Sequence, residues 1–156
     1  MILDRHVSLG NECLFINENV EISGLDEVRK SALQNSMREN GTVKSIRRAE
    51  ITDDIKEAVL KQLNAEYMEN SDAYIICISE EEIIIYSESE RGAFFGALYL
   101  ARRSMSGIGT GLIYNYPCVP IRMLKLYLPS EDNIEYFKKL IDLSAYYGYN
   151  KIMLEI

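Results

Sequence analysis

Apolar and polar residues alternate along the first part of the chain with periods typical of short strands and helices. Two β-prone runs, 13–16 and 20–22, predict a hairpin or a bent edge strand. Apolar positions at helical spacing predict a helix over 25–39 and a second one over about 54–68, with a strand over 43–51 between them. Such a mixture of strands and helices is typical of an α/β fold.

The clearest strand signal is a pair of apolar runs, 73–79 and 83–86, joined by the acidic turn Glu80-Glu81-Glu82. The short connection predicts an antiparallel hairpin. Three glutamates could serve as cation ligands, but consecutive side chains at a hairpin tip diverge, which favours a solubilising role.

A third helix is predicted from Ser87 to about Arg103. Ser87 and Glu90 have the spacing of a capping box, in which each residue's side chain bonds the backbone of the other. Gly92 and Gly96 share one face of this helix. A glycine costs a helix interior about 1 kcal/mol, so the pair indicates close packing of the helix backbone against the sheet.

After a glycine-rich stretch, 104–111, which is predicted to be a linker, the pattern changes. The run 121–128 is almost continuously apolar, as is typical of a strand buried on both faces of a parallel sheet. A helix with an apolar face follows over 134–145, Gly148 ends it, and 151–156 is a second strand of the buried type. Strand, helix and strand make one right-handed parallel crossover unit.

The predicted architecture is therefore α/β, in two parts. Residues 1–116 are expected to form an α+β domain, with a mostly antiparallel sheet and helices packed on one face. One helix cannot cover both faces of a parallel strand pair, so 117–156 is expected to be the first β-α-β segment of a truncated TIM barrel.

Composition and charge narrow the classes of partner. The chain has 156 residues, 47% of them apolar, and a formal net charge of −7. This charge repels phosphate backbones, so no nucleic acid is expected as a partner. No apolar run reaches membrane-spanning length, and residues 1–6 lack the features of a signal peptide, so no membrane partner is expected. With Met1 as the natural start, the chain is predicted to be cytoplasmic.

Metal and redox chemistry have few candidate residues. Cys13, Cys77 and Cys118 are odd in number and far apart, which favours reduced, buried thiols over a disulfide framework. His6 is the single histidine and is predicted to lie at the surface. Without a His-Glu-x-x-His helix, neither a metal site nor a cofactor is expected.

Two segments, 71–100 and 119–151, resemble in order and spacing the family 20 glycoside hydrolases, the β-N-acetylhexosaminidases. The first is similar to the end of that family's accessory domain, where a hairpin is followed by a helix with a Gly-Ala-Phe-x-Gly pattern. The second is similar to the first strand, first helix and second strand of the catalytic barrel. Residues 1–70 agree with the family only in architecture, since its accessory domain, often called zincin-like, is a sheet with helices on one side.

The resemblance implies hydrolysis of terminal N-acetylhexosamine residues by a substrate-assisted mechanism, with an Asp and a Glu at the ends of later barrel strands. Those positions would follow Ile156, so no catalytic residue is assigned in this chain. Arg122 matches an arginine of the first strand that binds hydroxyls of the terminal sugar, and is the one substrate-binding residue carried over. Arg122 pairing with a structural carboxylate is the alternative.

The chain also departs from the family pattern, which indicates a divergent subgroup. Met123 replaces a glycine, Tyr127 replaces an aspartate, and 151–155 lacks the histidines of the second strand. Glu155 then either points into the barrel mouth or is an ordinary charge at the end of a strand.

The leading hypothesis is a non-catalytic fragment of a β-N-acetylhexosaminidase-like hydrolase. Its partners would be the catalytic barrel of the same full-length chain, buttressed through the helix over 87–103, and the carbohydrate bound by the parent enzyme. Without the rest of the barrel, the exposed apolar faces would favour a homo-oligomer or a rearrangement.

The alternative is a free-standing carbohydrate- or protein-interaction module. It would use a patch of exposed tyrosines, namely Tyr114, Tyr116, Tyr146, Tyr147 and Tyr149. A complete small hydrolase would need two suitably spaced carboxylates, and no pair in the sequence has that spacing.

Overall fold

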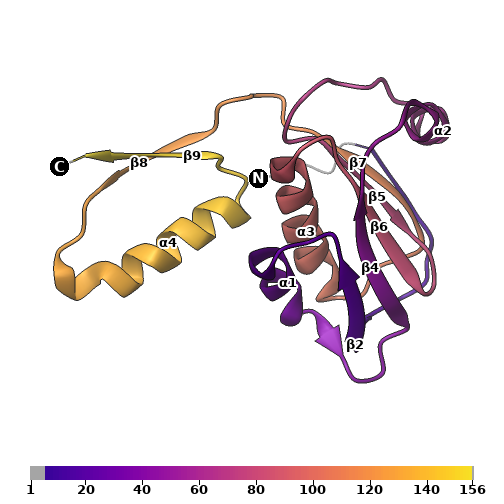
Figure 1. Ribbon diagram of the computed structural model, residues 1–156, viewed down its shortest axis with the longest axis horizontal. Coiled ribbons are helices and arrows are strands. Elements are labelled where there is room, and N and C mark those ends of the chain that lie inside the picture. The colour runs from indigo at the N-terminus through magenta and orange to yellow at the C-terminus, as the bar shows by residue number, and fades with distance from the viewer. Residues whose placement is uncertain (1–5, 156) are drawn as a thin grey trace. The chain divides into compact units, whose positions relative to one another are not determined.

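The computed structural model describes residues 6–155 and divides the chain into two compact units, Asp4–Tyr116 and Pro117–Ile156 (Figure 1). They are called the N-terminal unit and the C-terminal unit below. Residues 1–5, on which most of the signal-peptide argument rests, lie outside the described residues.

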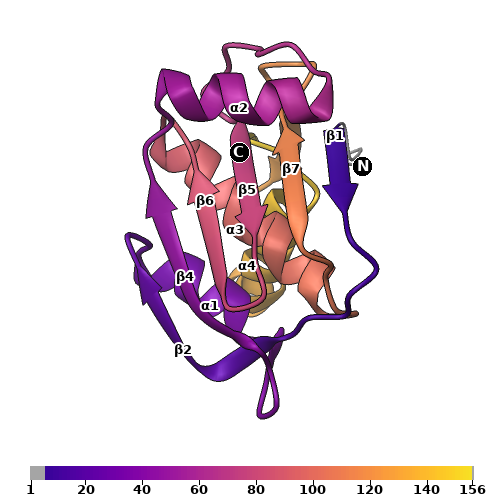
Figure 2. The ribbon, with the colours of Figure 1, turned by 90° about the vertical axis from the view of Figure 1, so that its right-hand side faces the viewer.

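A seven-stranded sheet forms the centre of the N-terminal unit, in the order β1-β7-β5-β6-β4-β2-β3 (Figure 2). The pairs from β1 to β6 are antiparallel, and the pairs from β6 to β3 are parallel. The strands are β1 (His6–Leu9), β2 (Ile16–Ser23), β3 (Met37–Arg38), β4 (Val43–Ala49), β5 (Tyr74–Ile78), β6 (Glu82–Tyr86) and β7 (Gly111–Asn115).

The prediction of a mostly antiparallel sheet is therefore only partly right. A helix connects β2 to β4, and such a crossover brings the second strand back parallel to the first. The predicted hairpin of β5 and β6 is confirmed, and it returns β6 parallel to β4. Local sequence patterns indicate the hairpin but not the strand beside which it lies.

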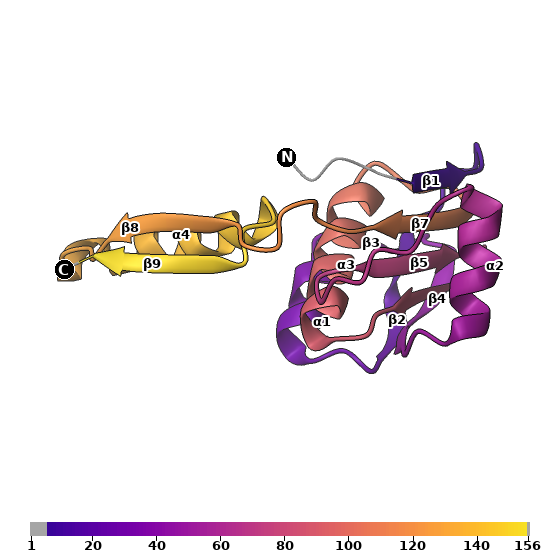
Figure 3. The ribbon, with the colours of Figure 1, turned by 90° about the horizontal axis from the view of Figure 1, so that it is seen from above.

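The helices lie on both faces of the sheet, which corrects the expectation of a single covered face. α1 (Glu27–Gln34) and α3 (Glu90–Ser104) lie on one side, and α2 (Asp53–Leu63) lies on the other (Figure 3). Alternate residues of β5 show the reason: Ile76 packs into the core under α1 and α3, whereas Ile75 packs against Val59 of α2. Because β5 is apolar on both faces, it needs a cover on each side.

The close packing predicted for the third helix is confirmed. A Cβ atom built on Gly96 would lie 2.7 Å from Cγ2 of Ile85, and one built on Gly92 would collide with the carbonyl oxygen of Ala73. Both glycines thus allow the backbone of α3 to approach the sheet closely. The contacts that require them lie within the N-terminal unit.

The predicted cap of this helix is wrong by two residues. The Oγ atom of Ser89 accepts a hydrogen bond from the backbone N–H of Gly92 at 3.0 Å, and Ser87 is fully buried before the helix begins. Ser89 fits the N-cap preference as well as Ser87 does, so the serine pattern left two choices.

Three other local predictions differ from the structure. The runs 13–16 and 20–22, predicted to form a hairpin or a bent edge strand, do not form a hairpin: residues 17–19 between them lie inside the continuous strand β2, where the pairing with β4 shifts register. The helix predicted over 25–39 ends at Gln34 and is followed by β3. The sequence does not predict the strands β1 and β7; β7 begins at Gly111, the last residue of the expected linker.

The C-terminal unit is a single β-α-β unit, as predicted. Its elements are β8 (Met123–Tyr127), the short helix η1 (Glu131–Asn133), α4 (Ile134–Tyr146) and β9 (Lys151–Glu155). β8 and β9 pair in parallel, from Met123 opposite Lys151 to Tyr127 opposite Glu155. Gly148 has a φ of 84°, in the left-handed region that glycine favours, and it follows the end of α4.

Candidate functional site

Arg122, the predicted substrate-binding residue, lies directly before β8. Its Nε atom donates a hydrogen bond to the carbonyl oxygen of Gly148 at 2.5 Å, and a terminal guanidinium nitrogen donates to the carbonyl oxygen of Val119 at 2.8 Å. These bonds join the segment that leads into β8 to the turn that follows α4.

Asn150 completes the same network from the other strand. Its Oδ1 atom accepts a hydrogen bond from the backbone N–H of Arg122 at 2.9 Å, and its Nδ2 atom donates to the carbonyl oxygen of Pro120 at 2.8 Å. The backbone N–H of Asn150 donates to the carbonyl oxygen of Arg122 at 2.9 Å. Arg122 and Asn150 together fix the register at the amino ends of the two parallel strands.

This position bears on the predicted role of Arg122. In a barrel built from parallel strands, active sites lie at the carboxyl ends of the strands. Arg122 is at the amino end of β8, and its bonds named above go to backbone carbonyl groups. Sugar binding by Arg122 stays a prediction. The hydrogen bonds named above have a structural role, because they join two segments of the backbone; they are called the clamp below.

The carboxyl ends of β8 and β9 bring three other side chains together. Tyr127 lies opposite Glu155 in the strand pairing. The Nζ atom of Lys125 is 2.6 Å from Oε2 of Glu155 and 5.8 Å from the centre of the Tyr127 ring. Sequence reasoning missed Lys125 because it lies inside a mostly apolar run; in the folded strand, exposed and half-buried residues alternate over 123–127.

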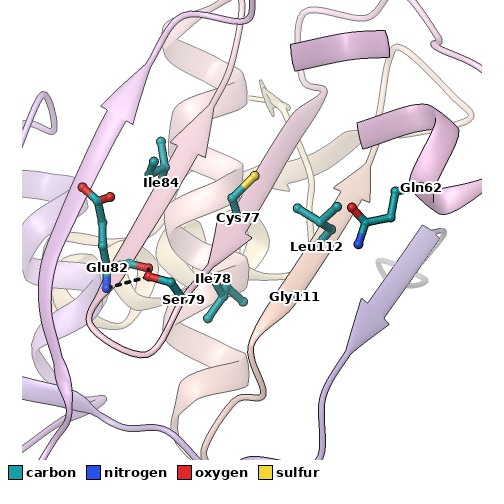
Figure 4. Close-up of a pocket in the computed structure, with 8 residues that line it drawn as sticks. All are labelled: Gln62, Cys77, Ile78, Ser79, Glu82, Ile84, Gly111 and Leu112. Carbon is teal, nitrogen blue, oxygen red and sulfur yellow. Dashed lines mark hydrogen bonds between the residues drawn. The ribbon is translucent and has the colours of Figure 1, made fainter. Parts of the chain in front are cut away.

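The N-terminal unit has a shallow pocket of about 310 Å³ on the α2 face of its sheet (Figure 4). The side chains of Cys77, Ile84 and Leu112 form its floor, and Gln62 of α2 lies at its edge. Burial raises the pKa of the Cys77 thiol to about 11, so the group stays protonated at neutral pH and is a poor nucleophile. The pocket therefore has an inert, largely apolar floor.

The acidic turn between β5 and β6 is neutralised in part by β4. A carboxylate oxygen of Glu81 lies 2.5 Å from Nζ of Lys44, and one of Glu82 lies 2.9 Å from Nε of Arg47. Among residues 6–155 no group of three or more His, Cys, Asp or Glu side chains could hold a metal ion. His6 begins β1, and its side chain lies outside the described part of the structure.

Within residues 6–155 the cysteines form no disulfide, but their predicted burial is wrong for two of them. Cys13 and Cys118 are exposed, and Cys77 is half-buried. Cys13 and Cys118 lie outside the named strands, where an apolar neighbourhood in the sequence does not imply a covered position.

The tyrosine patch of the alternative hypothesis is not formed as expected. Tyr114 is fully buried, and its hydroxyl accepts a hydrogen bond from the backbone N–H of Met68 at 2.7 Å. Tyr116 packs against it, with ring centres 5.3 Å apart, whereas Tyr146, Tyr147 and Tyr149 belong to the C-terminal unit. Tyr114 thus serves the core under α2.

Within the described residues, no helix has both the length and the apolar character needed to cross a membrane. The cytoplasmic location stays a prediction.

No protein-family model and no curated protein sequence matches the chain. Solved structures match it over nearly its whole length. The GH20 β-N-acetylhexosaminidase from Streptomyces coelicolor aligns with a TM-score of 0.63 at 18% identity, over 98% of this chain and 34% of that one. The GH20 exo-β-N-acetylglucosaminidase from Vibrio harveyi, solved with N-acetylglucosamine, aligns with a TM-score of 0.66 at 16% identity, over 99% of this chain and 25% of that one.

A protein of another glycoside hydrolase family, CpGH84D, aligns similarly, with a TM-score of 0.64 at 17% identity, over 95% of this chain and 29% of that one. The chain thus spans about a third or less of the length of these proteins. Its fold is that of a part of GH20 and GH84 glycoside hydrolases.

Proposed function

We propose that this chain is a non-catalytic amino-terminal fragment of a glycoside hydrolase similar to the β-N-acetylhexosaminidases. The N-terminal unit is the accessory domain, and the C-terminal unit opens the catalytic barrel. The parent enzyme removes terminal N-acetylhexosamine residues. The observation that carries the proposal is the fold match through both units, over 98% of this chain with the S. coelicolor enzyme.

The C-terminal unit supports the same proposal independently. Its parallel strand pair has one helix, and apolar side chains of the pair and of the segments around it, such as Ile121, Leu128 and Met153, stay exposed. Parallel strands are normally buried on both faces, because their crossover helices lie there. The unit therefore has the surface of a fold that further strands and helices complete.

A barrel active site collects side chains from the ends of several strands, and hydrolysis of a glycosidic bond uses groups on both sides of that bond. This chain supplies two strands of a barrel, so its role is to complete and buttress a site that later strands carry. The partner of the N-terminal unit is then the barrel of the same polypeptide, and the carbohydrate is bound by the parent enzyme.

The test compares two polypeptides with a chromogenic substrate, p-nitrophenyl N-acetyl-β-D-glucosaminide. We expect the full-length natural polypeptide that contains residues 1–156 to release p-nitrophenol, and residues 1–156 alone to release none. If the full-length protein hydrolyses neither this nor any other p-nitrophenyl glycoside, the proposal that the parent is a glycoside hydrolase is contradicted. If residues 1–156 alone hydrolyse the substrate, the proposal that the fragment is non-catalytic is contradicted.

A further inference from the structure

The two ends of the β8/β9 pair have different chemistry. At the amino ends, the side chains of Arg122 and Asn150 bond to backbone atoms of neighbouring turns. At the carboxyl ends, Tyr127 and Glu155 are direct neighbours across the two strands. The amino ends of the pair therefore carry hydrogen bonds that join backbone segments, whereas the carboxyl ends carry a group of neighbouring polar side chains.

The side chains of this group lie on one face of the strand pair. In β8, Lys125 and Tyr127 alternate with Leu124 and Leu126, which are the less exposed residues of the strand. Figure 3 shows α4 running along one face of the pair, so the less exposed leucines mark the face toward the helix. Lys125, Tyr127 and Glu155 occupy the opposite face, which in a closed barrel is the interior.

Lys125, Tyr127 and Glu155 offer what a sugar ring requires. The Glu155 carboxylate accepts hydrogen bonds from hydroxyl groups, and the Lys125 ammonium, 2.6 Å from it, donates them and holds the carboxylate in place. The Tyr127 side chain is 71% exposed, and its ring can pack against the C–H face of a sugar while its hydroxyl bonds to another group.

We propose that Lys125, Tyr127 and Glu155 form the part of the sugar-binding wall that this chain contributes, with Glu155 accepting hydrogen bonds from hydroxyls of a hexose ring. The inference rests on the proposed function, since it takes β8 and β9 as barrel strands. It assigns sugar contact to the carboxyl end of the pair, and it leaves Arg122 and Asn150 the task of fixing the register of the strands that carry the wall.

The experiment uses the full-length natural polypeptide and p-nitrophenyl N-acetyl-β-D-glucosaminide. Glu155→Gln keeps the size of the side chain but removes the charge, and we expect kcat/KM to fall about 10- to 100-fold, mainly through KM. The matched control is Lys151→Gln, which changes a charged residue at the amino end of the same strand and should alter kcat/KM less than about twofold.

A second variant separates sugar binding from a purely structural ion pair. Lys125→Gln breaks the pair with Glu155 but keeps the carboxylate, so its KM should rise less than that of Glu155→Gln. Equal increases of KM in both variants, together with equal losses of thermal stability, would assign the pair to structure and overturn the inference.

The remaining outcomes are also decisive. A wild-type enzyme that hydrolyses the substrate while Glu155→Gln leaves kcat/KM unchanged overturns the inference and leaves the proposed function standing. A wild-type protein that hydrolyses no p-nitrophenyl glycoside overturns the proposed function, and the inference with it.

Discussion

The two units of this chain differ in how far they bury their apolar residues. Every buried apolar side chain among the described residues lies between Leu14 and Tyr114, in the N-terminal unit. Of the sixteen large apolar side chains that are exposed in the described part of the chain, twelve lie between Val119 and Leu154, although the C-terminal unit is much the smaller one. Because apolar burial is the main favourable term in folding, the first unit has a core of its own, and we expect the second unit to be much less stable by itself.

The strands of the two units show why. β5 and β8 are both strongly apolar runs, and the sequence predicts burial for each. In the N-terminal unit α3 packs on one face of β5 and α2 on the other, whereas β8 has α4 on one face. A continuous apolar run thus indicates that both faces of a strand should be buried. Whether a helix or another sheet packs on each face depends on the fold and cannot be determined from the run itself.

The largest expected effect sets a core residue of the first unit against an exposed residue of the second. Ile85 is fully buried under α3, so Ile85→Ala should lower the free energy of unfolding of the N-terminal unit by about 2–5 kcal/mol. Leu143→Ala, at an exposed position of α4, should change stability by less than about 0.5 kcal/mol. Urea denaturation of both variants measures this; similar losses would contradict the comparison.

A smaller effect is expected where α3 meets the sheet. Alanine favours a helix by about 1 kcal/mol over glycine. Gly92→Ala should nonetheless destabilise the N-terminal unit by about 1–3 kcal/mol, because the added methyl group collides with the Ala73 carbonyl oxygen. Thermal unfolding compares it with Glu57→Ala, at an exposed position of α2, which should be close to neutral. A stabilising Gly92→Ala would show that the contact is not tight.

In the C-terminal unit, the clamp at the amino ends should contribute about 1–2 kcal/mol. Asn150→Ala removes the side-chain hydrogen bonds to Arg122 and Pro120, so the amide of Arg122 should exchange with solvent roughly tenfold faster or more. The control is Asn133→Ala, which removes an exposed hydrogen bond to Ser130 in the same unit and should leave that amide unchanged. Unaltered exchange in Asn150→Ala would contradict the role of the clamp.

The smallest effect is an ion pair that depends on pH. Nζ of Lys56 lies 2.8 Å from a carboxylate oxygen of Glu88, and this hydrogen bond lowers the pKa of Glu88. A lowered pKa means that the stabilisation is present above the ordinary pKa of glutamate and is lost as pH falls through the folded-state value. Both side chains are partly exposed, so Glu88→Gln should cost less than about 1 kcal/mol at neutral pH.

Denaturation at neutral and strongly acidic pH tests this, with Glu57→Gln, an exposed residue of α2, as the control that should show no cost at either pH. A cost of Glu88→Gln that persists at acidic pH would show that the ion pair is not its source.

The C-terminal unit could be predicted from the sequence because its signals are local. The apolar runs of β8 and β9 and the glycine after α4 determine each element without reference to distant residues. In the N-terminal unit, β7 follows a glycine-rich stretch and is stabilised by pairing with β1 and β5, which are distant in the sequence. Short strands of this kind cannot be recognised locally, and neither can the parallel pairing of β4.

In the candidate site, too, some residues could be predicted from the sequence and others only from the pairing of the strands. Resemblance to a family drew attention to Arg122, but its place at the amino end of β8 follows only from the exact start of the strand. Glu155 was considered as a residue of the barrel mouth, whereas Lys125 was hidden within an apolar run. Parallel pairing in the observed register makes Lys125, Tyr127 and Glu155 neighbours.

Hydrogen–deuterium exchange of residues 1–156 tests most directly whether one unit has a complete core and the other does not. We predict slow exchange, near the limit of global unfolding, for backbone amides of β5, β6 and α3, and much faster exchange for those of β8, α4 and β9. Equally slow exchange in both units of a monomeric chain would contradict the account, because it would show that the C-terminal unit is stable without further structure.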